Sequence, residues 1–444
     1  MNQTHSDKEN VNETVVNEEF FCKKNRYLLD NAATLFSLVS SRRIPCLFRL
    51  SSSLKEPVKI KVLQQAFENI LPRFPYYYVN LRPGFSWYHW REVRGTPKVI
   101  LDERNPCQKM PIRRKGFLPF RVRAYQNRIA VEFHHSLTDG TGALTFLRAL
   151  VGEYFHLLGI KVEDWKDVFR PDQKPNPEEF EDAFKRYYEK TVPEPEKIIR
   201  AFHLPYKLEK KGIYHITTGI VPIRDLLKLT KSHSVSLTEF LSAVYIDTLQ
   251  EILLSLPEKQ QKKLLKPIRL MIPVNLRRIY PSKTMRNFSL YVTPGIDPRL
   301  GKFTFDEILK EVFHYMRVEV NDKYINQQIA RNVRGELHPL MQATPLFIKK
   351  MFGKLIYNHL GEFLYSGVLT NLGKVSMPEP LDNYIEEFQF LPAPSPVLKT
   401  GCAIVSFKDS LYINFGRVVK ESEVERLFFT RLRKLGLKVK IETN

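Results

Sequence analysis

The chain has 444 residues. A domain with a single hydrophobic core is usually shorter than this, so the length predicts two domains or one large two-lobed unit. Its hydrophobic content of 43% is that of a soluble globular protein, and no apolar run of about 18 residues predicts a membrane-spanning helix. The net charge of +21 is spread along the chain instead of being gathered in one arm or stripe, which argues against a nucleic-acid-binding protein.

The first predicted elements follow a polar N-terminal segment, residues 1–24. This segment lacks periodicity and a signal-peptide core, so we expect a disordered or loosely docked leader and a cytoplasmic protein. We predict the first lobe over residues 25–175. Alternating apolar residues predict a strand around 46–50, a helix begins at Pro57, and a tyrosine-rich run predicts a strand over 74–81.

Residues 176–211 are rich in Asp, Glu, Lys and Pro, which predicts a charged linker with one helix near 178–189. We predict the second lobe over residues 212–444. It repeats the coarse strand and helix order of the first lobe, and capping boxes at Ser236–Glu239 and Thr304–Glu307 mark the start of two of its helices. The pattern predicts a mixed α/β fold of two lobes.

The four cysteines are Cys22, Cys46, Cys107 and Cys402, and they are scattered along the chain. Their spacing fits neither a set of metal ligands nor a disulfide framework. We therefore expect inert thiols, no metal site and no tightly bound cofactor.

One short stretch combines the residue types of a proton-transfer site. His134 and His135 end an alternating strand pattern, Asp139 follows in the same turn, and helical spacing begins after Gly140. An imidazole accepts a proton near neutral pH, and a carboxylate can hold the loop that carries it. Gly140 and Gly142 suit a tight turn that admits a substrate close to the backbone. The alternative is a strand end whose histidines form only local hydrogen bonds.

In this strand, turn and helix setting, the pattern His-His-x-x-x-Asp-Gly resembles the signature of the acyl-CoA-dependent acyltransferase superfamily. That superfamily includes chloramphenicol acetyltransferase, the alcohol acetyltransferases and the nonribosomal peptide condensation domains. The resemblance implies two lobes of chloramphenicol acetyltransferase-like fold with the active site in a tunnel between them. The segment 273–277 resembles the stretch that carries a structural arginine, and 30–33 and 370–373 resemble counterparts in the alcohol acetyltransferase branch.

The resemblance also implies roles for single residues. His135 is the general base, and His134 shapes the turn. Asp139 points away from the reaction and pairs with Arg277, and Gly140 has a structural role beside them. A general base of this kind needs a pKa near 7. A solvated surface charge is the alternative interpretation of Arg277.

A donor for the tetrahedral oxyanion is expected from Thr370 or Asn371, which the pattern places at the end of a strand. An ordinary turn is the other interpretation of this Asn-Leu-Gly sequence. The Asp-Phe-Gly-Trp-Gly motif of plant members is absent from the chain. The Asn-Asp helix motif of wax ester synthases is also missing from residues 238–250. Together with the other departures from the family pattern, these absences favour a stand-alone enzyme similar to the alcohol acetyltransferases.

The function implied is transfer of an acyl group from acyl-CoA, a co-substrate, to an alcohol or amine acceptor. Two alternatives stay open: a condensation-type enzyme whose acyl donor is bound to a carrier protein, and a non-catalytic binding protein of the same fold. The positive charge could surround a mouth for the phosphates of coenzyme A, form a face for an acidic carrier protein or an anionic membrane, or have no specific partner. The acyl chain length and the acceptor depend on scattered tunnel-lining residues, which the motifs do not identify.

Overall fold

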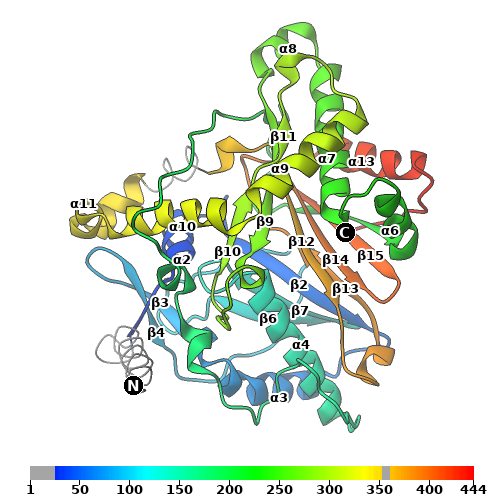
Figure 1. The fold of residues 1–444 in the computed structure, drawn as a ribbon. Helices are drawn as coiled ribbons and strands as arrows, with labels where there is room; N and C mark the ends of the chain where they lie inside the picture. Colours follow the sequence, from blue (N-terminus) through cyan, green and yellow to red (C-terminus); the bar gives the residue numbers. More distant parts are fainter. Residues whose placement is uncertain (1–25, 353–360) are drawn as a thin grey trace, which may run out of the picture.

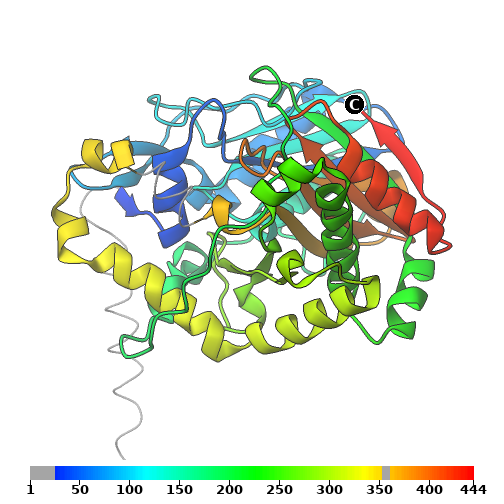
Figure 2. The same ribbon diagram turned by 90° about the horizontal axis from the view of Figure 1, so that it is seen from above.

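A computed structural model of the chain describes residues 26–352 and 361–444, so the predicted leader lies outside the described residues. Two large sheets and one small sheet form its framework (Figures 1 and 2). The small sheet has the order β1-β4-β3, with β1 at Arg26–Leu28, β3 at Val79–Pro83 and β4 at Tyr88–Glu92. The mixed α/β architecture predicted from the sequence is confirmed.

The first large sheet has five strands in the order β13-β2-β7-β6-β5. Its strands are β2 (Leu47–Leu54), β5 (Ile100–Leu101), β6 (Phe120–Tyr125), β7 (Arg128–His134) and β13 (Ile385–Leu391). The helices α3 (Ile60–Ile70) and α4 (Gly140–Leu157) share its core. Asp139 caps α4, and α3 places apolar residues on one buried face, so both helices follow the local pattern of the sequence.

The second large sheet has eight strands, in the order β10-β9-β12-β14-β15-β8-β16 with β11 beside β9. Its strands are β8 (His215–Pro222), β9 (Ile268–Asn275), β10 (Ser289–Val292), β11 (Gly295–Ile296), β12 (Gly367–Val375), β14 (Thr400–Phe407), β15 (Ser410–Arg417) and β16 (Lys440–Thr443). Around it lie α6 (Ile223–Ser232), α7 (Leu237–Ser255), α8 (Glu258–Leu264), α9 (Phe305–Glu319) and α13 (Glu423–Lys434). Further helices of the described residues are α2 (Asn31–Val39), α5 (Ala183–Arg186), α10 (Asp322–Leu337) and α11 (Pro339–Ala343), and residues 346–352 are also helical.

The two large sheets are joined through β13 and β14. Although β13 lies within the predicted range 212–444, it pairs antiparallel with β2 of the five-stranded sheet. Strand β14 is buried along its whole length because its two faces enter different cores. Ala403 and Val405 belong to the core of the five-stranded sheet, whereas Cys402 and Ile404 belong to the core under α7 and α13. The core of the five-stranded sheet is therefore built by both halves of the sequence, whereas the core under α7 and α13 contains only residues from 202 onward.

Most local predictions hold, but one predicted strand begins later than expected. Both predicted capping boxes are present, at the starts of α7 and α9. The strand expected over 74–81 begins only at Val79, because Pro72 and Pro75 open two short 3-10 turns before it. The charged segment 176–211 contains α5 and one 3-10 turn, and its residues from 189 to 207 have no helix or strand.

Candidate active site

His135 is the first residue after β7, and backbone contacts fix its position. Its N–H donates to the carbonyl of Cys46 at 2.8 Å, and its own carbonyl accepts from Asn287 Nδ2 at 2.9 Å. The imidazole ring packs against two aromatic rings, Phe36 at 4.9 Å and Phe48 at 4.4 Å between centroids. The ring is partly exposed, and its nitrogens form no hydrogen bond with the described residues.

The apolar surroundings keep this imidazole neutral. Desolvation lowers the pKa of His135 to about 4, and the charge of Asp139 opposes the shift only in part. This pKa lies below the value near 7 that a general base needs, because burial beside Phe36 and Phe48 desolvates the ring. At neutral pH the imidazole is therefore unprotonated. One of its ring nitrogens can accept a hydrogen bond from a bound group.

His134 is the last residue of β7 and is completely buried. Its Nδ1 lies 2.7 Å from Ser136 Oγ and accepts from the Ser136 N–H at 3.2 Å, which closes the turn after the strand. Burial is the main cause that lowers its pKa to about 3. His134 therefore contacts the turn, as the sequence predicted for it, and its side chain has no access to solvent.

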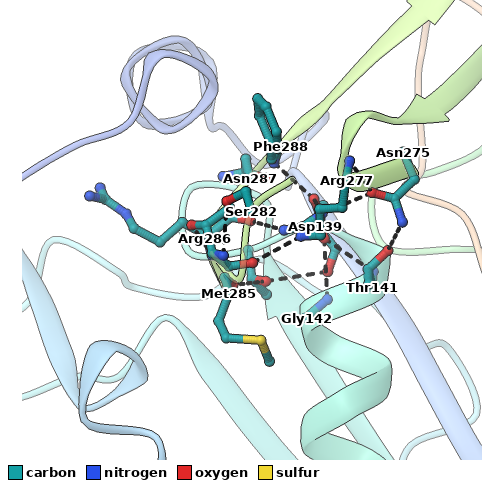
Figure 3. Close-up of polar contacts among 12 residues, drawn as sticks. Asp139, Thr141, Gly142, Asn275, Arg277, Ser282, Met285, Arg286, Asn287 and Phe288 are labelled. Atoms are coloured by element: carbon teal, nitrogen blue, oxygen red, sulfur yellow. Dashed lines mark hydrogen bonds and ion pairs between the residues drawn. The ribbon is translucent and has the colours of Figure 1, made fainter. Parts of the chain in front are cut away.

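Asp139 connects three elements through one carboxylate (Figure 3). Its Oδ1 accepts from the backbone N–H groups of Thr141 and Gly142, at 3.1 and 3.2 Å, and so caps α4. Its Oδ2 accepts from Arg277 Nη1 at 2.8 Å and from the Phe288 N–H at 2.9 Å. The structure brings the two predicted partners together, with 8% of the Asp139 side chain and 12% of the Arg277 side chain exposed.

Arg277 holds the loop 276–288, which connects β9 to β10 and passes beside the start of α4. Its guanidinium also donates to the carbonyls of Thr284 and Arg286, at 2.9 and 2.6 Å. A charge with this many partners inside the protein orders the loop and does not serve as a solvated surface group. The loop thereby becomes a rigid support under the turn that carries His135.

Gly140 and Gly142 lie in space that protein atoms fill. A Cβ on Gly142 would come within 2.2 Å of Thr138 Oγ1, 2.5 Å of the Tyr77 hydroxyl and 2.7 Å of the Met285 carbonyl. A Cβ on Gly140 would meet the Leu372 side chain at 2.8 Å. The sequence interpretation that both glycines admit substrate is corrected: they allow α4 to approach the loop 276–288 and β12.

Thr370 and Asn371 lie in the middle of β12 and not at its end, because the strand continues to Val375 after an irregularity in its pairing with β14. The Asn371 amide donates to Thr238 Oγ1 at 3.1 Å, and its oxygen accepts from the Gly373 N–H at 2.8 Å. Neither residue contacts His135 among the interactions of the described residues. From this segment it is Leu372 that reaches the motif, through Gly140.

The segment that starts at Asp30 also meets the motif. Asp30 caps α2 by accepting from the Ala33 N–H at 2.7 Å, and the Asn287 amide lies 3.3 Å from both of its carboxylate oxygens. The same amide donates to the His135 carbonyl. Burial raises the pKa of Asp30 to about 7 although Arg286 is nearby. Helix α2, which carries Phe36, is thus tied to the turn.

Sequence reasoning missed several residues around His135: Phe36, Phe48, Asn287 and Leu372. Phe48 had a usable signal, since it alternates with Cys46 and Leu50 in a strand that pairs with β7. The others come from segments far from the motif in sequence. Among the described residues, no group of three or more His, Cys, Asp or Glu side chains is arranged to hold a metal ion, and no helix is long and apolar enough to cross a membrane.

Comparisons with known proteins bear on the fold. No protein-family model and no curated protein sequence matches the chain, whereas solved structures do. Polyketide synthase associated protein 5 from Mycobacterium tuberculosis matches with a TM-score of 0.59 at 12% identity, over 92% of this chain and 96% of that one. The first condensation domain of the CDA synthetase matches with a TM-score of 0.55 at 11% identity, over 92% and 94% of the two chains.

Two further matches come from peptide synthetases. The starter condensation domain of rhizomide synthetase, solved in complex with C8-CoA and Leu-SNAC, has a TM-score of 0.55 at 12% identity and covers 98% of this chain and 96% of its own. The chain also spans 42% of a longer nonribosomal peptide synthetase, with a TM-score of 0.60 at 14% identity. The chain therefore has the condensation-domain fold, and the chloramphenicol acetyltransferase-like architecture implied by the motif is confirmed.

Proposed function

We propose that the chain is an acyltransferase that moves an acyl group from a thioester to an amine or hydroxyl, with His135 as general base. The observation that carries the proposal is the His135 imidazole itself: neutral, partly exposed and without a hydrogen-bond partner among the described residues. Its turn is held from the other side by the Asp139–Arg277 ion pair. Such a ring presents an unprotonated nitrogen at neutral pH and is fixed in place.

In the proposed reaction, His135 removes the proton of the acceptor as its nitrogen or oxygen attacks the thioester carbonyl. A tetrahedral intermediate forms, the carbon–sulfur bond breaks, and the proton passes to the leaving thiolate. Thr370 and Asn371 remain the candidates for the oxyanion donor. Asn371 uses one of its two amide N–H groups toward Thr238 Oγ1, so its second N–H and the Thr370 hydroxyl are both available as donors.

The comparisons with solved structures bear most on the identity of the acyl donor. Acyl-CoA is the donor that the motif resemblance implies. Condensation domains act on carrier-protein-bound substrates, and this likeness favours a carrier-bound donor for the present chain. Both donors present the acyl group on the same phosphopantetheine arm, so the chemistry at His135 is common to them.

The test is thiol release from a panel of acyl-CoAs and acylated carrier proteins, with and without pooled amines and alcohols. We expect acceptor-dependent release by the wild type and a decrease of about 10²- to 10⁴-fold in His135→Ala. His314→Ala, which alters an exposed histidine on α9, is the matched control and should keep full activity. Equal rates for His135→Ala and the wild type would show that His135 is not the base.

A further inference from the structure

Several large apolar side chains project from one end of the molecule. The end of α10, helix α11 and the helical segment 346–352 carry most of them, and the turn between β3 and β4 carries one more. In both views α11 lies at an extremity of the molecule, away from the two large sheets (Figures 1 and 2). We call this group the apolar tip, and its members are between 48% and 75% exposed: Phe85, Leu337, Leu340, Phe347, Met351 and Phe352.

Contacts with the turn between β3 and β4 hold α11 and the segment 346–352 in place. The Leu346 N–H donates to the Phe85 carbonyl at 2.8 Å, and the Ser86 hydroxyl donates to the Gln342 carbonyl. Lys349 Nζ donates to the Ser86 carbonyl at 2.8 Å. The two segments are 256 residues apart where Ser86 meets Gln342, yet they form one structural unit. The backbone of the apolar tip is therefore fixed while its side chains project.

Three members of the tip start close together. Phe347 and Met351 are four residues apart on one helical segment, so they point to the same side. The Phe85 backbone is bonded to Leu346, the residue directly before Phe347. Single exposed apolar residues are common on soluble proteins, whereas a group of bulky ones marks a contact with another molecule.

The segments that carry the tip are also basic. Residues 82–91 and 337–352 contain no Asp or Glu, and their cations are Arg82, Arg91, Lys349 and Lys350. Lys350 is exposed. The acidic residue directly before the second segment, Glu336, pairs with Lys185 at 2.9 Å, and only 11% of its side chain is exposed. The local charge therefore favours an anionic partner, and the net charge of +21 of the whole chain acts in the same direction.

Charge and side-chain type separate the candidate partners. A second copy of the chain would bring two basic tips together, and like charges oppose that contact. A bilayer that contains anionic lipids attracts Lys and Arg, and it accepts bulky apolar side chains below its headgroups. Tryptophan and tyrosine are favoured at that boundary. Trp87 and Tyr88 follow Phe85, and Lys349 and Lys350 follow Phe347, so apolar, aromatic and cationic side chains occur side by side.

We propose that the apolar tip docks the protein on an anionic lipid surface. Phe85, Phe347 and Met351 enter the boundary between the headgroups and the acyl chains, and Lys350 contacts the lipid phosphates. Because the tip lies at an extremity, the two large sheets stay in water (Figures 1 and 2). The contact does not involve His135, so it is independent of the proposed acyl transfer.

Vesicle flotation measures the contact without a substrate. We would compare vesicles of equal parts phosphatidylcholine and phosphatidylglycerol with vesicles of phosphatidylcholine alone, using the full-length protein at low ionic strength. The wild type should bind the anionic vesicles about tenfold to hundredfold more tightly, and added salt should weaken this preference. Phe347→Ser/Met351→Ser removes two inserted apolar groups and should bind the anionic vesicles at least about tenfold more weakly. Lys350→Gln should reduce the preference by about threefold to fivefold.

The matched control is Leu227→Ser/Leu300→Ser, which removes two exposed apolar side chains from the eight-stranded half and should bind like the wild type. Wild-type affinity in Phe347→Ser/Met351→Ser would show that positive charge alone attracts the protein, and this result would overturn the docking role of the tip. A wild type that binds neither kind of vesicle would overturn it as well and would assign the tip to a protein partner.

Fluorescence quenching by brominated phosphatidylcholine tests insertion. Trp87 is partly exposed beside the tip, whereas Trp90 is buried. Bromine atoms near the headgroup end of the acyl chains should quench the vesicle-bound wild type, and Trp87→Phe should lose most of this quenching. A bound wild type without quenching would contradict insertion.

Sedimentation velocity distinguishes the remaining occupant, a second copy of the chain. We expect the wild type and Phe347→Ser/Met351→Ser to sediment alike in the absence of vesicles. A wild-type dimer that dissociates in this variant would assign the tip to a second copy and overturn the lipid proposal.

Discussion

At the scale of single residues, the candidate base depends on the rings around it. Phe36 and Phe48 contact the imidazole of His135 and withdraw it from water. Desolvation disfavours the charged form of a histidine, and here it lowers the pKa to about 4. The active, neutral form is therefore present well below the pH at which a solvated histidine becomes protonated.

The pH dependence of kcat/KM checks this directly. Since protonation inactivates a general base, kcat/KM should stay level from about pH 8 to about pH 5 and decrease only as pH approaches 4. Phe36→Ser admits water to the ring and should move the acid limb toward the ordinary histidine value near 6.5. Leu35→Ser, on the exposed side of the same helix, should leave the limb in place. A wild-type limb already near pH 6.5 would contradict the desolvation argument.

At the scale of elements, the start of α4 is the meeting point of the motif, the loop 276–288 and β12. Thr138 Oγ1 and the Tyr77 hydroxyl both donate to the Met285 carbonyl, at 2.7 and 2.8 Å. Gly142 leaves the space in which these three groups meet. A glycine is needed here because α4 and the loop 276–288 approach each other closely. Its backbone conformation is an ordinary helical one.

Replacement of Gly142 measures the importance of this contact. Gly142→Ala should lower the free energy of unfolding by about 2–3 kcal/mol, because the new methyl group meets the Met285 backbone and two buried hydroxyls. Acyl transfer should decrease with it, since the turn that carries His135 moves. Gly335→Ala, in α10 with open space around it, should stabilise the protein by up to about 1 kcal/mol. Denaturant unfolding of both variants provides the comparison, and a Gly142→Ala protein as stable as the wild type would contradict the packing argument.

At the scale of the whole molecule, the two large sheets are interdependent. Strand β13 completes the five-stranded sheet from the second half of the sequence, and Phe390 of β13 contacts Phe48. The Asp139–Arg277 ion pair joins the halves at the opposite end of the motif. The predicted lobe 25–175 therefore lacks one strand of its own sheet, and the range 212–444 supplies that strand.

Separate expression of the two halves tests this interdependence. A fragment of residues 1–211 lacks β13, so the buried strand β2 would present an open edge and part of the core would be exposed. We expect this fragment to aggregate or to unfold without a cooperative transition, and co-expression with residues 212–444 to restore a soluble complex. A fragment 1–211 that is soluble and unfolds cooperatively by itself would show that β13 is dispensable.

Interactions within a few residues were determined by the sequence itself. Asp139 caps α4, Ser236 and Thr304 open α7 and α9, and the strand before His134 alternates as expected. These features follow from hydrogen bonds and side-chain periodicity that act over one turn or one strand. The motif residues and the pairing of Asp139 with Arg277 were accessible for a different reason, because they resemble a known pattern.

Only the tertiary structure decided which distant segments surround the motif. Phe36 covers His135, Leu372 fills the space at Gly140 in place of Thr370 or Asn371, and β13 crosses to β2. Many segments of this chain have the strand or helix pattern that such positions require. Which of them meet depends on side-chain packing summed over the whole core, a quantity that no local stretch of sequence contains.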